Sequence, residues 1–165
     1  MKFNSVKEYF YKLNNTGYQL MMVPLILFIY FYSQSYFYQH NPILNQQSII
    51  DYLFIAVAVL SLVILTTVQL IFAKQTRKVA GEIGLGIKLE KLGSLLKTRM
   101  IWLAFIALLM PLGLILSGDQ VFSIFFVLAL AWYFLHWPNP KQVAKLLKLK
   151  GDEKEMVLSR GEAFR

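Results

Sequence analysis

Residues 100–137 decide the fold of this chain, and they read MIWLAFIALLMPLGLILSGDQVFSIFFVLALAWYFLHW. Two apolar stretches, Met100–Leu116 and Val121–Trp137, flank the residues SGDQ, and neither stretch contains Asp, Glu, Lys or Arg. A helix needs about 20 mainly apolar residues, within a range near 17–25, to cross the hydrocarbon core of a bilayer. Because so short a connection leaves room only for a tight turn, the stretch predicts two antiparallel transmembrane helices.

Two further stretches in the N-terminal half of the chain meet the same criterion. They are Tyr18–Phe37, in which Pro24 predicts a kink, and Leu53–Ala73. The composition agrees, because 57% of the residues are apolar and only 16% are charged, compared with about 25% charged in soluble domains. We therefore predict an all-α membrane protein, with a four-transmembrane-helix bundle in a single membrane domain. Its spans are expected at about 18–37, 53–73, 100–116 and 121–137.

The distribution of basic residues predicts the orientation of the four spans. All 17 lysines and arginines lie in residues 1–17, 74–99 and 138–165, and none lies in the connections 38–51 and 117–120. Cytoplasmic segments of membrane proteins carry an excess of Lys and Arg. Both termini, the loop 74–99 and the tail 138–165 are therefore predicted to be cytoplasmic. Since these bases border apolar spans in every case, we expect them to contact anionic lipid headgroups and not nucleic acid.

The loop 74–99 has the pattern of an amphipathic cytoplasmic helix. Its leucines recur at a spacing of +4, +3 and +4, which places them on one helix face. They are Leu85, Leu89, Leu92 and Leu96. The helix is expected either at the membrane surface or packed on the bundle. The preceding GEIGLG does not have the G-x-G-x-x-G order of a dinucleotide-binding loop, so we interpret it as a hinge after the second span.

The sequence WPNPKQVAKLLKLKG at 137–151 marks the exit from the fourth span and a second amphipathic segment. Pro138 disfavours helix at the preceding residue, Asn139 is a candidate N-cap, and Pro140 suits the first position of the next helix. Gly151 is expected to end that helix, and Asp152 is expected to cap another short one. The candidate contacts to lipid headgroups are Lys141, Lys145 and Lys148.

Inside the spans, the polar candidates for a functional role are Thr66, Thr67 and Gln69 in the second span. The threonines can donate to carbonyls of their own helix, and Gln69 can bond to a neighbouring helix. Two interpretations stay open: these residues make polar contacts between helices, or they line a polar path. Proton-coupled transporters usually need an ionisable residue within the membrane, and the four spans contain no acidic or basic residue. Contacts between helices are therefore favoured.

The two histidines, His40 and His136, are the candidates for a cofactor site. The predicted topology separates them by about the hydrocarbon thickness, roughly 30 Å, so one haem or metal ion cannot bind both. We expect both to be interfacial residues, and a single-histidine site completed by another subunit stays open. The chain has no cysteine and no recognisable catalytic set. We therefore predict no enzyme activity, no catalytic residue, no metal and no cofactor.

Several short motifs follow one another in the C-terminal part of the chain. Arg99 opens the third span, LSG stands at 116–118, WPNPKQV follows the fourth span, and LLKL precedes GDEKE. In these features residues 92–158 resemble a family of small four-span inner-membrane proteins of Bacteroidetes-type bacteria. The chain departs from that family at Ala104, where the family has Glu, and at Leu146, where it has Asp. The resemblance implies four spans in a bacterial inner (cytoplasmic) membrane and carries no activity.

Three function classes follow from these observations. The first is a non-catalytic integral membrane protein that acts through helix–helix contacts, as an accessory subunit or a homo-oligomer. It is favoured because the spans are uncharged and the soluble parts are small. The second is a small channel or transporter whose path forms on oligomerisation. The third is a cofactor-binding electron-transfer subunit that uses one of the histidines.

Overall fold

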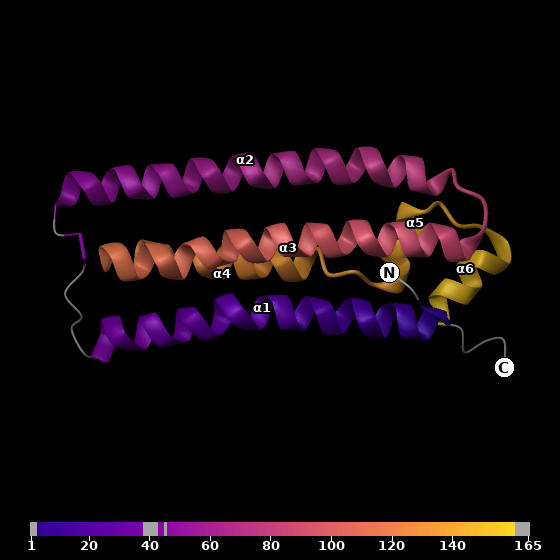
Figure 1. Ribbon diagram of the computed structural model, residues 1–165, viewed down its shortest axis with the longest axis horizontal. Coiled ribbons are helices and arrows are strands. Elements are labelled where there is room, and N and C mark those ends of the chain that lie inside the picture. The colour runs from indigo at the N-terminus through magenta and orange to yellow at the C-terminus, as the bar shows by residue number, and fades with distance from the viewer. Residues whose placement is uncertain (1–2, 38–42, 45, 161–165) are drawn as a thin grey trace. The chain divides into compact units, whose positions relative to one another are not determined.

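The computed structural model describes residues 3–37, 43–44 and 46–160. All regular secondary structure in these residues is helical, which confirms the prediction of an all-α chain (Figure 1). The helices are α1 (Val6–Phe37), α2 (Gln47–Ala80), α3 (Leu85–Ser117), α4 (Val121–Leu135), α5 (Pro140–Leu146) and α6 (Gly151–Leu158).

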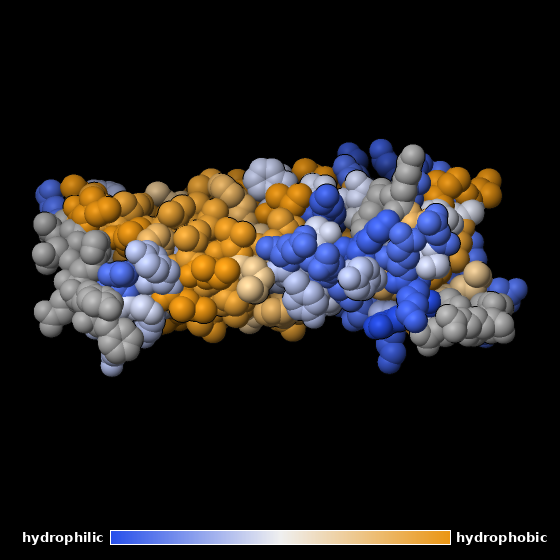
Figure 2. Space-filling model, turned by 60° about the horizontal axis from the view of Figure 1, so that its bottom comes forward, coloured by the Kyte–Doolittle hydropathy of each residue, from blue (hydrophilic) through white to orange (hydrophobic). Residues whose placement is uncertain are grey.

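Three of these helices, α1, α2 and α3, are long and apolar enough to cross a membrane. The helix α4 has 15 residues and meets the criterion only together with α5, from which it is bent by 71°. The described residues therefore contain three candidate spans, or up to four if the bent pair is one span. On the face drawn in Figure 2, hydrophobic side chains form one broad area and hydrophilic ones gather beside it. This is the pattern of a membrane protein.

The long helices extend well beyond the predicted spans. At a rise of 1.5 Å per residue, the 34 residues of α2 make a helix of about 50 Å, compared with a hydrocarbon core of roughly 30 Å. Most of the predicted connection 74–99 is consequently helical. The helix α2 continues to Ala80 and α3 begins at Leu85, so that only residues 81–84 form the turn.

The turn between α2 and α3 is made by the glycine-rich sequence that we interpreted as a hinge. Gly84 has a φ of +94°, a conformation that glycine adopts without the steric cost of a Cβ. Next to it, Lys91 of α3 pairs with Glu82 of the turn. The chain therefore reverses at residues 81–84 and forms a helical hairpin.

The chain divides into two compact units by its internal contacts. The first unit comprises Met1–Tyr18, Val68–Met100 and Trp137–Arg165, and the second comprises Gln19–Thr67 and Ile101–His136. All 17 lysines and arginines fall within the sequence ranges of the first unit. The division by contacts thus coincides with the division by basic charge. The prediction of a single membrane domain stays a prediction.

The core of the first unit contains the leucine stripe of α3. Leu89, Leu92 and Leu96 are 1%, 0% and 3% exposed, and Leu85 at the start of the helix is half-buried. Tyr9 and Leu13 of α1 are fully buried in the same unit. We expected this amphipathic segment either at the membrane surface or packed on the bundle. In the structure its leucine stripe is packed inside the first unit. Burying an aliphatic side chain of this size contributes about 1.5–3 kcal/mol, which explains why the stripe is covered.

Aromatic side chains pack the second unit. The ring of Phe28 in α1 stacks on Phe126 in α4, with centroids 4.0 Å apart and planes 9° apart. Phe54 of α2 meets the edges of Phe122 and Phe125 of α4. Ring pairs in such geometries contribute about 0.5–1.5 kcal/mol beyond the area that they bury. Aromatic contacts therefore hold α4 against both α1 and α2 within this unit.

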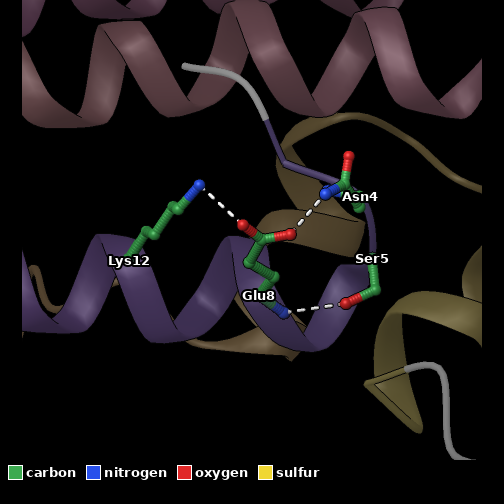
Figure 3. A network of polar contacts seen from close by, with 4 residues as sticks. All are labelled: Asn4, Ser5, Glu8 and Lys12. Carbon is green, nitrogen blue, oxygen red and sulfur yellow. Dashed lines mark hydrogen bonds and ion pairs between the residues drawn. The ribbon is translucent and has the colours of Figure 1, made fainter.

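The start of α1 is fixed by a capping motif that the sequence analysis did not identify (Figure 3). Ser5 Oγ accepts a hydrogen bond from the backbone N–H of Glu8 at 3.1 Å. The carboxylate of Glu8 accepts one from the N–H of Asn4 at 2.7 Å and pairs with Lys12 at 2.6 Å. The signal was the S-x-x-E spacing ahead of an apolar run, which predicts a capping box.

This motif predicts a pH-dependent contribution to stability. The hydrogen bond from Lys12 and the N–H of Asn4 hold the pKa of Glu8 below its usual range. A carboxyl with a depressed folded-state pKa stabilises the fold above its unfolded pKa, about 4.3, and loses that contribution as the pH falls through the folded value. We expect Glu8→Gln to lower the thermal midpoint in detergent at neutral pH, and we expect this deficit to shrink as the pH falls through the folded pKa of Glu8.

The matched control is Ser5→Ala, which removes the N-cap and carries no titratable group. It should cost about 1 kcal/mol at every pH at which the protein is folded. Circular dichroism at 222 nm as a function of temperature measures both variants. A Glu8→Gln midpoint deficit that is the same at pH 7 and pH 3 would contradict the assigned role of the carboxylate.

Candidate functional site

The polar residues predicted in the second span do not form one cluster. Thr66 donates its hydroxyl to the carbonyls of Leu62 at 2.8 Å and Val63 at 3.0 Å in its own helix. Thr67 is exposed. Gln69 is half-buried and accepts a hydrogen bond from α3. The functional role proposed for these three residues, as helix contacts or as a path, stays a prediction.

The donor to Gln69 is Arg99, which the sequence analysis counted among the basic residues of a loop. Its side chain is 9% exposed, and its Nη2 donates to Gln69 Oε1 at 3.0 Å. The guanidinium carbon lies 4.5 Å from the centroid of the Phe72 ring, within the range of a cation–π interaction. Its buried Nε has no hydrogen-bond partner. No ion pair to Arg99 occurs among the residues that the structure describes.

The candidate headgroup lysines meet around one open hollow formed by α5 and α6, which pack against each other. The hollow has a volume of about 540 Å³. Its basic residues are Lys141, Lys145, Lys148, Lys150 and Lys154, and its apolar residues are Ala144, Leu149 and Leu158. The structure therefore brings the three predicted lysines together and adds two that the sequence did not single out.

The start of α5 follows the sequence prediction. Asn139 has an extended backbone, and its side chain accepts a hydrogen bond from the N–H of Gln142 at 2.8 Å. Pro140 occupies the first helical position. Because residues four apart lie on one helix face, this start places Lys141 and Lys145 side by side at the hollow.

The end of α5 differs from the prediction. We expected Gly151 to close the helix, but Lys148 does so with a φ of +52°. The N–H of Leu149 bonds to the carbonyl of Ala144 at 3.0 Å, and the N–H of Lys148 bonds to the carbonyl of Lys145 at 3.2 Å. These two bonds define a Schellman motif, in which glycine usually takes the position of Lys148. The tight ending turns Lys148 and Lys150 back toward the hollow that α5 lines.

The cap predicted at Asp152 is also wrong. The helix α6 begins at Gly151 with Lys150 as its N-cap residue, and Asp152 lies in its first turn. Acidic side chains in a first turn interact favourably with the positive end of the helix dipole. Asp152 therefore has a role near the predicted one, through charge instead of a capping hydrogen bond.

The acidic residues of α6 do not line the lysine hollow. Glu153 pairs with Lys88 of α3 at 2.8 Å, and the Lys88 side chain in this pair is only 13% exposed. This ion pair holds α6 on α3 and occupies the carboxylate away from the hollow. Within the described residues, none of the five lysines of the hollow forms an ion pair. Their charge is therefore uncompensated there.

Of the two histidines, the structure describes His136. His136 lies just after the end of α4, where its Nδ1 is 2.9 Å from the carbonyl oxygen of Trp132 and its ring packs against the Trp132 ring. The prediction for His40 lies outside the described residues. Within those residues no three His, Cys, Asp or Glu side chains come together as a metal site. The assignment of His136 as an interfacial residue stays a prediction.

The chain matches no protein-family model, no curated protein and no solved structure. The functional argument therefore rests on the residues described above.

Proposed function

We propose that this chain is a non-catalytic integral membrane protein that acts through helix–helix contacts, as an accessory subunit of a membrane complex or as a homo-oligomer. In this proposal four spans cross a bacterial inner membrane as a bundle with both termini cytoplasmic, and the bent pair of α4 and α5 supplies the fourth span and its exit. The division of the chain supports that orientation, since every basic residue belongs to the sequence of one compact unit.

The observation that carries the proposal is the exposure of α2. No residue in the most apolar 18-residue stretch of α2 is buried, whereas 56% of the corresponding stretch of α3 is. Ile55, Val59 and Leu62 are 56%, 54% and 62% exposed. In a bilayer, packing, interhelical hydrogen bonds and lipid entropy drive helix association. The helix α2 therefore offers a long surface for such packing, which the described residues of the chain leave exposed.

Native mass spectrometry after extraction in a mild detergent tests this proposal. We expect a species heavier than one 19.1 kDa chain, either a multiple of that mass or a complex with other subunits. The chain has no cysteine, so single cysteines can be introduced cleanly. Ile55→Cys, Val59→Cys and Leu62→Cys in membranes should include at least one position that cross-links to a neighbouring subunit.

Leu114→Cys is the matched control, because Leu114 is 1% exposed and cannot reach another chain without unfolding. A clean monomer by mass spectrometry, together with no cross-link at any of the three α2 positions, would overturn the proposal. Cross-linking at Leu114→Cys to the same extent as in α2 would also count against it, because it would indicate non-specific association.

A further inference from the structure

The five-lysine hollow of α5 and α6 has the features of a ligand site and has no role in the proposed helix contacts. Five lysines line it, which we call the rim, together with three apolar residues, Ala144, Leu149 and Leu158, which we call the floor. We infer that this hollow binds the phosphate-bearing headgroup of an anionic lipid as a discrete site. The ligand is thus a phosphate ester attached to a glycerolipid, held by charge at the rim and by apolar contact at the floor.

Charge is the first part of the argument. Five ammonium groups that line one hollow repel one another, and each phosphate oxygen that enters relieves this repulsion and accepts hydrogen bonds. Among the residues that the structure describes, no acidic residue lines the hollow, and Glu153, which is next to Lys154 in the sequence, pairs with Lys88. The site therefore has an unmet requirement for negative charge. A phosphomonoester with two negative charges meets it better than a phosphodiester with one.

The apolar floor distinguishes a lipid from a free anion. Ala144 and Leu149 are each 6% exposed, and Leu158 is 40% exposed. Free inorganic phosphate gains nothing from contact with these side chains. The glycerol and first methylene groups of a lipid do gain, because each buried methylene contributes to the transfer free energy from water. The combination of rim and floor therefore fits the boundary between headgroup and acyl chain.

The backbone at Lys148 gives independent support. A non-glycine residue in the left-handed region is strained, and glycine would occupy this Schellman position without that cost. Strained residues cluster at functional sites, where the side chain is needed in that place. Here the strain places an ammonium group at the rim of the hollow. Lys148 thus strains the backbone of the turn, but its positive charge favours the binding of an anion.

The test is a binding titration on the detergent-solubilised full-length protein, read by native mass spectrometry of lipid adducts. The probes are dioctanoyl phosphatidic acid, dioctanoyl phosphatidylglycerol and dioctanoyl phosphatidylcholine, and inorganic phosphate serves as a soluble competitor. We expect phosphatidic acid to bind more tightly than phosphatidylglycerol, and phosphatidylcholine not to bind. Millimolar phosphate should compete weakly, because it cannot use the apolar floor.

Two variants of the hollow and one outside it make the test specific. Lys145→Gln and Lys148→Gly should each weaken phosphatidic acid binding about fivefold, the effect of one basic residue near an anionic headgroup. Lys97→Gln removes the same charge from an exposed position of α3 and should leave the affinity unchanged. Because Lys148→Gly relieves the backbone strain, its thermal midpoint should be equal to or above that of the wild type, so its loss of binding is not a loss of folding.

Three outcomes would overturn the inference. An equal loss of affinity in Lys97→Gln would show general attraction of the net charge instead of a site. Full displacement of the lipid by equimolar inorganic phosphate would show a free-anion site. Unchanged affinity in both Lys145→Gln and Lys148→Gly would remove the hollow from lipid binding altogether. None of these results depends on whether the protein is monomeric, so the inference and the proposed function fail separately.

Discussion

Gly113→Ala should destabilise the second unit, although alanine is the better helix former. A Cβ atom at Gly113 of α3 would overlap the ring of Phe122 of α4, and that ring is only 1% exposed. Overpacking of a buried site typically costs about 1–3 kcal/mol, which exceeds the gain of up to about 1 kcal/mol for replacing glycine with alanine in a helix. We expect a lower thermal midpoint in detergent, and a larger loss for Gly113→Val.

Gly86→Ala is the matched control for this prediction. Gly86 lies in the same helix, and a Cβ added there would meet nothing within 4 Å. Its midpoint should be unchanged or raised, because only the helix propensity changes. A double variant, Gly113→Ala with Phe122→Leu, adds a second test. Replacing the Phe122 ring with the smaller leucine side chain leaves room for the new methyl group at position 113. The loss of stability in the double variant should therefore be smaller than the sum of the losses in the two single variants. Additive losses would show that the ring is not what excludes the methyl group.

The helix caps show which local signals in the sequence are sufficient. Asn139 and Pro140 start α5 as predicted because both effects are local: an extended residue with a side-chain acceptor, followed by a residue with a fixed φ. The end of the same helix was mispredicted, because the glycine rule is a preference. In the structure Lys148, and not Gly151, ends the helix. Ser5 and Glu8 have the S-x-x-E spacing of a capping box, a local signal that was not used to predict the start of α1.

The lysine hollow was also predictable only in part, because local spacing indicates some of its contacts and not others. The spacing of Lys141 and Lys145 places them on one face of any helix that contains both. That Lys150 and Lys154 join them depends on the turn at Lys148 and on the ion pair between Lys88 and Glu153, which connects residues far apart in sequence. No periodicity within one segment indicates such a contact.

The predicted spans are shorter than the helices that contain them because the spans were placed by hydropathy alone. The charged residues of 74–99 lower the average hydropathy there, and the leucine stripe was followed only from Leu85 to Leu96. The spacing of that stripe, +4 and +3, continues beyond Leu96 to Arg99 and then to Leu103. Both are buried, at 9% and 7% exposed. Following the stripe would have predicted a continuous helix with an arginine on its buried face.

The buried position of Arg99 leads to the second strong prediction, which concerns the order of the thermal midpoints of three variants. Gln69→Leu removes the hydrogen-bond acceptor of a buried guanidinium and leaves the charge in place. A hydrogen bond to a charged group contributes about 1.5–3 kcal/mol, so the thermal midpoint should fall markedly. Arg99→Met removes the charge itself and leaves a half-buried neutral amide, which can turn toward other partners. Its midpoint should fall less than that of Gln69→Leu, although it also loses the contact with Phe72.

The double variant, Arg99→Met with Gln69→Leu, decides the matter, because replacing a buried polar pair with apolar residues of similar volume is often neutral or stabilising. It should therefore be more stable than Gln69→Leu alone, which additive effects cannot produce. Arg77→Met serves as the control, since Arg77 is an exposed residue of α2 and its loss should change the midpoint little. If Arg99→Met proves the most damaging single change and the double variant is worse still, the guanidinium is itself a source of stability. If the order of the thermal midpoints is as expected, the protein retains the buried charge of Arg99 at a cost in stability. Polar residues at core positions of packed helices are best known for fixing the register of one helix on another, and this is the role that we expect for the bond from Arg99 to Gln69 between α3 and α2 in the first unit.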